Sequence, residues 1–367
     1  MRLYSFFLLC SLTIASGCQS NSTGAPGVVV SPVSNTPAAN ANDETNGNQT
    51  NAVASADTTT DSPQTSAGDN SAPASTSADL SDDAFETDRA QVTGNVQNQE
   101  LTEISGLAAS TRQNNTFWAI NDSGNQPKLF AFNHTGQSLG TWTIAAENRD
   151  WEDMASAWIN GESYLFIADI GDNLRVKDEH VVHVIAEPLL DNTSGTLEPL
   201  HTIRFRYPGL SHNAESLAID GEWLYVLTKE PLIDGERQAS RVYRIPLSFS
   251  QQNQIADAEL IAQLAIPAVS LEAMLIASVG GVDVTQPTAF DIDEQNRTAY
   301  VLTYRSVYQY RREQNQSWAE ALAQPRNLIH SHSLSQAEAL AVSENGVVWF
   351  TSENLPAPLW ALPGAQL

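Results

Sequence analysis

Cysteine is nearly absent from this chain of 367 residues, which contains only two, Cys10 and Cys18. Cys10 lies within the first apolar run and Cys18 lies four residues after the end of that run, which we expect to be part of a signal peptide. If Cys10 is removed with that peptide and Cys18 carries lipid, no thiol remains in the folded part. This excludes a structural disulfide, a zinc thiolate site and a cysteine nucleophile, and leaves core burial as the source of stability.

Basic residues are also scarce, with 18 Lys and Arg against 43 Asp and Glu and a formal net charge of −25. An anionic surface repels phosphate backbones, and the sequence has no basic stripe with interleaved aromatics. We therefore expect no nucleic-acid partner. Acidic clusters of this kind suit cations better.

Several hydrolase motifs are missing. The chain has no His-Glu-x-x-His helix motif and no Arg-His-Gly signature, and its Gly136-Gln137-Ser138-Leu139-Gly140 leads from a turn into a predicted strand, whereas the Gly-x-Ser-x-Gly elbow of hydrolases leads into a helix. Long apolar runs are missing as well, since Phe6 to Ile14 is too short to span a bilayer as a helix. Any catalysis must therefore rest on groups brought together by the fold.

The N-terminus combines Arg2, that short apolar run and the ending Ala15-Ser16-Gly17-Cys18. The ending resembles the lipobox of bacterial lipoproteins. The resemblance implies cleavage before Cys18 and its acylation, and Gln19 in place of aspartate implies release to the outer membrane. We accordingly expect a signal peptide at residues 1–17, and the cell envelope as location.

Residues 18–88 are rich in Ser, Thr, Asn, Ala and Asp, lack Lys and Arg, and show no apolar period. Such a segment cannot bury enough apolar surface to offset the entropy lost on ordering. We expect a disordered tether between the lipid and a folded domain at residues 89–367.

A phrase recurs five times in that domain: a polar or acidic residue among apolar positions, a turn, and then an aromatic-rich strand. Internal repetition at this spacing predicts an array of small sheets. The five copies begin at Ser105-Gly106-Leu107, Glu152-Asp153-Met154, Glu215-Ser216-Leu217, Thr288-Ala289-Phe290 and Glu338-Ala339-Leu340.

Further short strands with turn signals follow each copy, and no long helical period appears, so the sequence predicts an all-β fold. We expect a β-propeller of five four-stranded blades. The last copy has three strands before the chain ends, and Ala90 to Val96 can supply its fourth, which closes the ring. A sixth blade built from Leu271 to Val284 is the alternative.

Aligning the copies gives two polar columns. Because strand side chains alternate with period 2, both columns are expected on one side of their strands, and a closed ring would crowd all ten side chains around its axis. The first column is Ser105, Glu152, Glu215, Thr288 and Glu338, and the second, two residues earlier, is Glu103, Asp150, Asn213, Gln286 and Gln336.

Loops after the second strands add further polar groups, among them Asn121-Asp122-Ser123-Gly124 and Asp169-Ile170-Gly171-Asp172-Asn173. Together with Asp150-Trp151-Glu152-Asp153 and His212-Asn213-Ala214-Glu215, they resemble a largely uncharacterised group of exported bacterial propellers. That group is similar in architecture to phytase-like esterase propellers and to calcium-dependent lactonase and gluconolactonase propellers.

The resemblance to the lactonase type implies one axial calcium ion. Crowded carboxylates need a cation or shared protons, and calcium prefers several oxygen ligands. The candidate ligands here are Glu152, Asn213, Glu215 and Glu338, with Glu103 and Asp150 behind them.

Two functions are compatible with such a site. In one, calcium polarises an ester, lactone or phosphoester while a base activates water. In the other, the polar site grips a ligand or an envelope partner without catalysis. We expect a monomer in either case. The candidate bases are Asp122, Asp153 and His212, and the candidate ligand-binding residues are Asn121, Asp169, Lys229 and Arg305.

Overall fold

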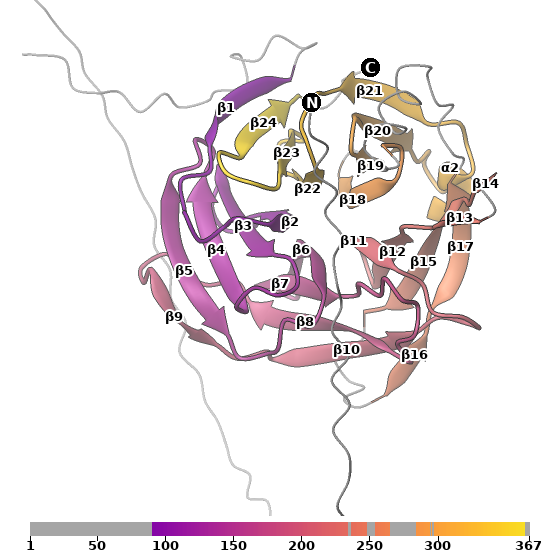
Figure 1. Ribbon diagram of the computed structural model, residues 1–367, viewed down its shortest axis with the longest axis horizontal. Coiled ribbons are helices and arrows are strands. Elements are labelled where there is room, and N and C mark those ends of the chain that lie inside the picture. Colours follow the sequence, from indigo (N-terminus) through magenta and orange to yellow (C-terminus); the bar gives the residue numbers. More distant parts are fainter. Residues whose placement is uncertain are drawn as a thin grey trace, which may run out of the picture. The chain divides into compact units, whose positions relative to one another are not determined.

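The computed structural model describes residues 90–233, 236–247, 254–264, 284–293, 295 and 297–363. These residues form five blades around a common axis, which confirms the predicted propeller (Figure 1). The expected signal peptide, Cys18 and tether lie outside the described residues. Within the described part, no helix has the length and apolarity needed to cross a membrane.

Each blade is an antiparallel sheet whose first strand lies nearest the axis (Figure 1). Blade 1 consists of β2 (Ile104–Ala109), β3 (Thr116–Asn121), β4 (Lys128–Asn133) and β5 (Ser138–Ile144). Blade 2 consists of β6 (Trp151–Ile159), β7 (Glu162–Asp169), β8 (His180–Ala186) and β10 (His201–Arg206). Blade 3 consists of β11 (Ala214–Asp220), β12 (Trp223–Thr228), β15 (Ser240–Pro246) and β17 (Glu259–Leu264), with a small hairpin of β13 (Leu232–Ile233) and β14 (Glu236–Arg237) after β12.

Blade 4 consists of β18 (Pro287–Asp293), β19 (Thr298–Thr303), β20 (Ser306–Arg311) and β21 (Asn327–Ser331). Blade 5 consists of β22 (Ala337–Val342), β23 (Val348–Ser352), β24 (Pro358–Leu362) and β1 (Gln91–Asn95). Strand β1 pairs antiparallel with β24, from Gln91 opposite Ala361 to Asn95 opposite Pro358. The predicted sharing of the last blade between the two ends of the domain is confirmed.

The first strands contact one another in a closed cycle, β2 to β6, β11, β18, β22 and back to β2. Strand β11 touches β18 directly, so no blade fits between blades 3 and 4. The six-bladed alternative is therefore wrong. The stretch from Leu271 to Val284, which would have formed that blade, lies outside the described residues except for Val284.

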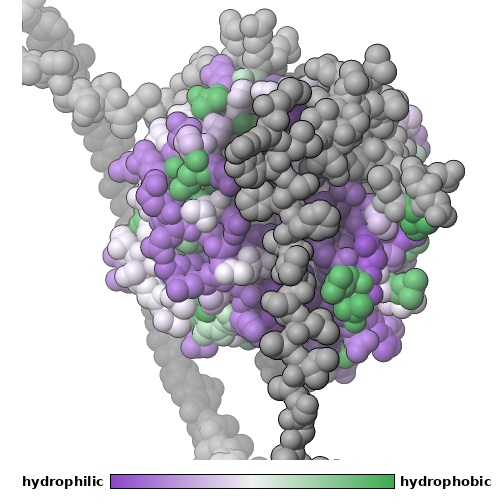
Figure 2. Space-filling view, in the orientation of Figure 1, coloured by the Kyte–Doolittle hydropathy of each residue, from purple (hydrophilic) through white to green (hydrophobic). Residues whose placement is uncertain are grey.

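The hydrophobic core is divided into five clusters, and each fills the space between two neighbouring blades. As a result, β2 and β3 are buried at every position, not only at alternate ones. Since both faces of these strands are covered, apolar and polar residues alternate only weakly along them. Polar residues dominate the face shown in Figure 2, with apolar residues scattered singly.

The connection between the third and fourth strands reaches back to the preceding blade in four cases. In blade 2 it forms β9 (Ser194–Leu197), which pairs parallel with β5, and in blade 3 it forms β16 (Ile255–Asp257), which pairs parallel with β10. In blade 4 it forms α2 (Trp318–Leu322), which packs against β17. In blade 1 the turn at Gly136 accepts a backbone hydrogen bond from Gln97 at 2.9 Å.

Candidate metal centre

Every first strand carries a β-bulge at the same place in its repeat, between Ile104 and Gly106 in blade 1 and at the equivalent positions of the other four blades. A bulge re-aims the extra residue and interrupts the strand pairing. The bulged residues are the first polar column, and all are buried, with exposed fractions of 8% or less: Ser105, Glu152, Glu215, Thr288 and Glu338.

The two hydroxyl members of this column join neighbouring first strands. The Ser105 hydroxyl donates to the Trp151 carbonyl at 3.2 Å, and the Thr288 hydroxyl donates to the Ala337 carbonyl at 2.7 Å. Each acceptor directly precedes the bulged glutamate of the next blade. The three remaining members are thus glutamates, grouped at the end of the axis where the first strands begin, which we call the acidic end.

Three carboxylates converge at the acidic end. Asp122 follows β3, Asp150 precedes β6, and Glu152 is the bulged residue of β6. One oxygen from each lies within 4.8 Å of the others. Two of the three, Asp150 and Glu152, were predicted as metal ligands, while Asp122 was predicted as a base.

Gly171, in the loop after β7, leaves the space that this triad occupies. A Cβ built on Gly171 would lie 2.1 Å from Glu152 Oε1 and 2.6 Å from Asp150 Cγ. Distances below 3 Å force something to move, so a larger residue would displace the carboxylates. The loop also brings Lys177 to 3.3 Å from Asp150 Oδ2.

The triad is poorly solvated, and its carboxylates repel one another when they are ionised. Burial raises the pKa of Asp122 to about 6, and the charges of Glu215, Asp150 and Glu338 act in the same direction. Burial also raises the pKa of Glu152 well above its usual range, followed by repulsion from Glu215, Asp122 and Asp150. Protons are retained here because the fold places negative charges where water cannot screen them.

The other two bulged glutamates, Glu215 and Glu338, flank Lys229, which follows β12. The Lys229 Nζ atom lies 3.1 Å from Glu215 Oε2 and donates to the Tyr304 hydroxyl at 3.0 Å. Tyr304 in turn donates to Glu338 Oε1 at 2.9 Å. Burial lowers the pKa of Lys229, but Glu215 and Tyr304 raise it by more, so this lysine is charged. Its positive charge offsets part of the negative charge of the axial glutamates.

Glu338 shares its surroundings with Glu353, from the loop after β23. Burial raises the pKa of Glu338 to about 8, with a further contribution from the neighbouring Glu353 carboxyl. Burial likewise raises the pKa of Glu215, against the effect of Lys229. Asn213 donates to Glu215 Oε1 at 2.8 Å, so the two columns meet in blade 3.

The second column does not converge as a whole. Asp150 and Asn213 join the acidic end, but Glu103 and Gln336 are exposed. Asn125 donates to Glu103 at 2.5 Å, and Gln336 donates to Glu353 at 2.7 Å. The expected crowding of ten side chains was wrong because the first strands begin after this column and the bulge breaks the alternation.

Two of the predicted bases are held by structural contacts. Asp153 is 1% exposed and accepts from the backbone amides of Met154 and Leu217, both at 2.8 Å. It links blades 2 and 3 inside the core. His212 lies 2.9 Å from Glu230 and 3.1 Å from the Tyr243 hydroxyl. Of the three, only Asp122 belongs to the triad.

The four predicted ligand-binding residues do not lie together at the acidic end. Only Lys229 lies among the axial glutamates. The Asn121 amide donates to the Glu100 carbonyl at 2.7 Å, and Arg305 donates to the Leu334 carbonyl at 2.8 Å. Asp169 is fully buried and pairs with Arg149 at 3.1 Å.

Sequence reasoning did not assign roles to Gly171, Lys177, Tyr304 or Glu353. Gly171, Tyr304 and Glu353 do lie in the loops after second strands that the repeat had marked as polar. The repeat register therefore held a usable signal for these three. Lys177 lies six residues beyond Gly171, and nothing in the repeat marks it.

The donor set fits calcium. Ligand oxygens on one calcium ion lie about 2.3–2.6 Å from it, so two of them are separated by at most about 5 Å, and the 4.8 Å spread of the triad is compatible with one shared ion. All three donors are carboxylates, which hard cations prefer. The absence of histidine and cysteine from the triad disfavours zinc.

Comparison with known proteins adds little. No protein-family model matches the chain, and no curated protein matches it. Among solved structures, a protein of Thermus thermophilus with a provisional assignment as an oxidoreductase (glucose dehydrogenase) matches with 10% identity and a TM-score of 0.39. The match covers 74% of this chain and 99% of that one, and similarity at this level carries no information about function.

Proposed function

We propose that the propeller binds calcium at the acidic end through Asp122, Asp150 and Glu152, and uses it to hydrolyse a small ester, lactone or phosphoester. The observation that carries the proposal is the convergence of these carboxylates within 4.8 Å, in a space that only glycine at position 171 leaves open. Without a metal ion, their mutual repulsion is relieved by protonation and in part by Lys177, which lies 3.3 Å from Asp150.

Bound calcium would supply a Lewis acid that polarises the substrate oxygen. The side chains of the protein would bind and orient the remainder of the substrate. Lys229, fixed by Glu215 and Tyr304, places a positive charge among the axial glutamates, where it can face an anionic group of the substrate. Asp122 is the one predicted base that lies at the triad, and it is only partly buried.

A non-catalytic binding function is the second candidate. It is favoured by the structural contacts of Asp153 and His212, which leave the site with fewer free bases than the sequence predicts. In this case calcium would fix the loops at the acidic end, and the same polar surface would hold a ligand or an envelope protein.

The location belongs to the proposal as well. The lipobox-like ending at Cys18 supports a lipoprotein held at the outer membrane. Wild-type protein should fractionate with membranes, and mass spectrometry should find acyl groups on Cys18. A Cys18→Ser variant that stays in the membrane fraction would contradict the anchor.

The cation site is tested by thermal unfolding of a Cys18→Ser protein treated with chelator. Added calcium should raise its melting temperature, because a ligand of the native state stabilises it. Glu152→Gln should abolish the rise. Glu313→Gln, an exposed acid between β20 and α2, serves as the matched control and should keep it.

Hydrolysis is tested by screening the same protein against lactones, aryl esters and phosphoesters with calcium or chelator. Turnover that requires calcium and is lost in Glu152→Gln supports the enzyme. A calcium-dependent rise in melting temperature without turnover in any class favours the binding function instead.

A further inference from the structure

Among the residues that the structure describes, one outer strand of the propeller lacks the cover that the other four have. The outer strands β5, β10, β17 and β1 are covered by β9, β16, α2 and the turn at Gly136, each of which comes from the next blade around the ring. The fifth outer strand is β21 of blade 4, which lies at the rim in Figure 1. In the described part of the chain it pairs with β20 alone.

The open edge of β21 follows from the way in which the ring closes. Each covering segment belongs to the connection between the third and fourth strands of the next blade. For blade 4 this connection would come from blade 5, whose third strand is β24 and whose fourth strand is β1. These two strands are the last and the first of the described chain, so no connecting loop runs from one to the other. The neighbouring candidates for the cover are the residues before β1 and those after β24.

Strands β9 and β16 favour the residues before β1. Strand β9 ends four positions before β10 begins, and β16 ends two positions before β17 begins, so each covering strand directly precedes the fourth strand of its blade. The same spacing from Gln91 places the end of a covering strand at position 87 or 89, outside the described residues. Ala90 and Ile329 of β21 pack against the same core cluster, between blades 4 and 5. The chain therefore enters β1 from the side of blade 4.

The side chains of β21 are less buried than those of the covered strands. All five are exposed or half-buried, and Leu328 is 57% exposed. By contrast, β5 buries Trp142 and Ile144, and β10 buries Phe205. An open strand edge presents backbone amides and carbonyls that can pair with another strand, and proteins usually cover such edges. Strand β21 is therefore suited to receive one more strand.

The last residues of the predicted tether have a sequence that can form this strand. Residues 84–89 read Ala-Phe-Glu-Thr-Asp-Arg, and Phe85 is the only aromatic residue between positions 19 and 88. Phenylalanine and threonine favour strands, and Phe85 and Thr87 would share one face because strand side chains alternate. Strands β9 and β16 likewise contain one large apolar residue each, Leu197 and Ile255.

We propose that residues 84–89 bind to the outer edge of β21 as a parallel strand and so complete the set of five covers. Backbone hydrogen bonds would hold the segment, as in other cases of strand addition to a sheet edge. Strand β21 ends at Ser331, opposite Ser306, and His332 then donates to the Arg305 carbonyl on the side of the acidic end. A parallel segment therefore enters from the opposite side, and the preceding tether leaves the propeller away from the acidic end. The inference does not rest on calcium binding or hydrolysis.

Hydrogen–deuterium exchange of the full chain tests the proposal. Glu86→Pro combined with Thr87→Pro removes two adjacent backbone donors and prevents strand pairing. Amides of Asn327–Ser331 should then exchange at least about fivefold faster than in the wild type, since the edge loses its partner. Thr58→Pro combined with Thr59→Pro is the matched control and should leave them unchanged, and the amides of β10, which β16 covers, should be unchanged in both variants. Equal exchange of β21 in the two variants overturns the proposal.

Cross-linking identifies the occupant of the edge. In a chain with Cys10→Ser and Cys18→Ser no native thiol remains, and cysteine is introduced at each of positions 84 to 89 in turn together with Leu328→Cys. An intramolecular disulfide should form, because paired strands bring Cα atoms within about 5–6 Å. The control replaces Leu328→Cys by Leu260→Cys, an exposed position of β17, and should form none. A disulfide between two chains, or no disulfide with Leu328→Cys, would show that a second copy or another partner occupies β21, and either result overturns the proposal.

Discussion

At the level of single residues, the central feature is the separation of two kinds of buried acid. Asp153 is satisfied by backbone amides and stabilises the packing of blades 2 and 3. Glu152, one residue earlier, faces other carboxylates and makes the site. These adjacent acids lie in different surroundings because successive strand side chains point to opposite faces, and Glu152 is the unpaired residue of the β-bulge.

Gly171→Ala tests the tight fit of the triad. The added methyl group would meet Glu152 Oε1 at 2.1 Å, so we expect the calcium-dependent melting shift to be lost, together with about 1–3 kcal/mol of stability from overpacking. The control is Gly161→Ala, at a turn with φ of +86° where an added Cβ meets nothing within 4 Å. It should lose stability through its backbone and keep the calcium response. A full calcium response in Gly171→Ala would contradict the geometry.

The raised pKa values predict how stability depends on pH without calcium. The pKa of Asp122 rises from 3.8 to about 6, and that of Glu338 rises from 4.5 to about 8. For each group, the folded state therefore binds more protons than the unfolded state at pH values between its ordinary and its raised pKa. The contribution of these groups to the free energy of unfolding is fully present below pH 4 and is lost as the pH rises through 6 and then 8.

Urea unfolding of chelator-treated wild-type and Glu338→Gln proteins isolates the Glu338 part of this effect. The free energy of unfolding of the wild type should fall relative to that of the variant as the pH rises toward 8. A constant difference between the two proteins would mean that Glu338 does not titrate as described. Calcium should weaken the pH dependence of the wild type.

At the level of strands and helices, the sequence predicts well what depends on local pattern. The second strands, the order of four strands per blade and the strand that closes blade 5 follow from apolar runs and turn residues. Strands β9 and β16 were missed because short polar segments become strands only by pairing with a neighbouring blade. Helix α2 was missed too, although Ser317 and Glu320 form a capping box that the sequence displays.

The candidate site was predictable to a similar depth. Repeat alignment found Asp150 and Glu152, since both occupy repeated positions. The alignment placed Asp122 in a loop but did not predict that it lies beside Asp150 and Glu152, because the paths of loops are set by tertiary contacts. The bulges themselves leave no mark in the sequence, and they decide which column residues are buried.

Thr288→Val tests the role of a hydroxyl at a bulge. The change keeps the shape of the side chain but leaves the buried Ala337 carbonyl without its donor, so we expect a loss of about 1–3 kcal/mol. Urea unfolding measures the loss. The calcium response should remain, since the link joins strands of blades 4 and 5 and not the triad. A variant as stable as the wild type would show that the bond contributes nothing.

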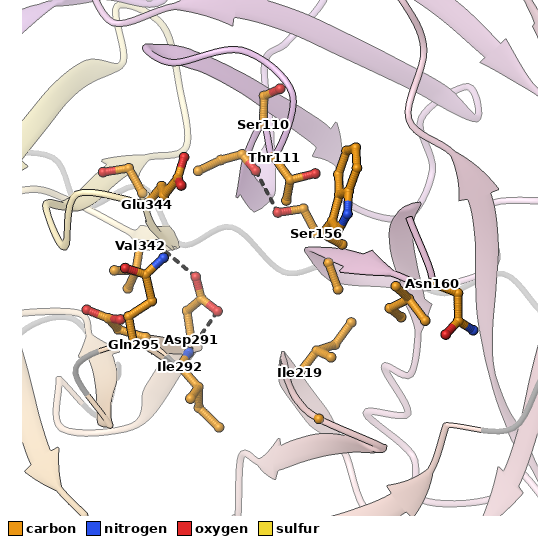
Figure 3. Close-up of a pocket in the computed structure, with 17 residues that line it drawn as sticks. Ser110, Thr111, Ser156, Asn160, Ile219, Asp291, Ile292, Gln295, Val342 and Glu344 are labelled. Atoms are coloured by element: carbon orange, nitrogen blue, oxygen red, sulfur yellow. Dashed lines mark hydrogen bonds between the residues drawn. The ribbon is translucent and has the colours of Figure 1, made fainter. Parts of the chain in front are cut away.

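Across the propeller as a whole, ring closure brings together acids that are far apart in the chain. The five interblade core clusters form a continuous cycle, so each blade is held by two neighbours. Closure also creates the two axial ends, one with the carboxylate triad and the other with a cavity of about 710 Å³, whose lining includes Ser110, Ser156 and Asp291 (Figure 3).

Removal of β1 tests this dependence. A chain lacking residues 90–96 loses the pairing with β24 and the buried Val96 side chain, and it exposes an unpaired strand edge. We expect at least about 3 kcal/mol less stability and self-association, because several backbone hydrogen bonds and apolar burial are lost together. Urea unfolding and size-exclusion chromatography would detect both. A monomer of unchanged stability would contradict the role of β1 in closure.

The most direct test of the account is a calorimetric calcium titration of chelator-treated protein. We predict one calcium ion per chain for the wild type and for Glu313→Gln, and binding weakened at least about tenfold in Glu152→Gln, as expected when a charged ligand is lost. Absence of binding in the wild type, or unchanged affinity in Glu152→Gln, would contradict the proposal that the acidic end is a metal centre.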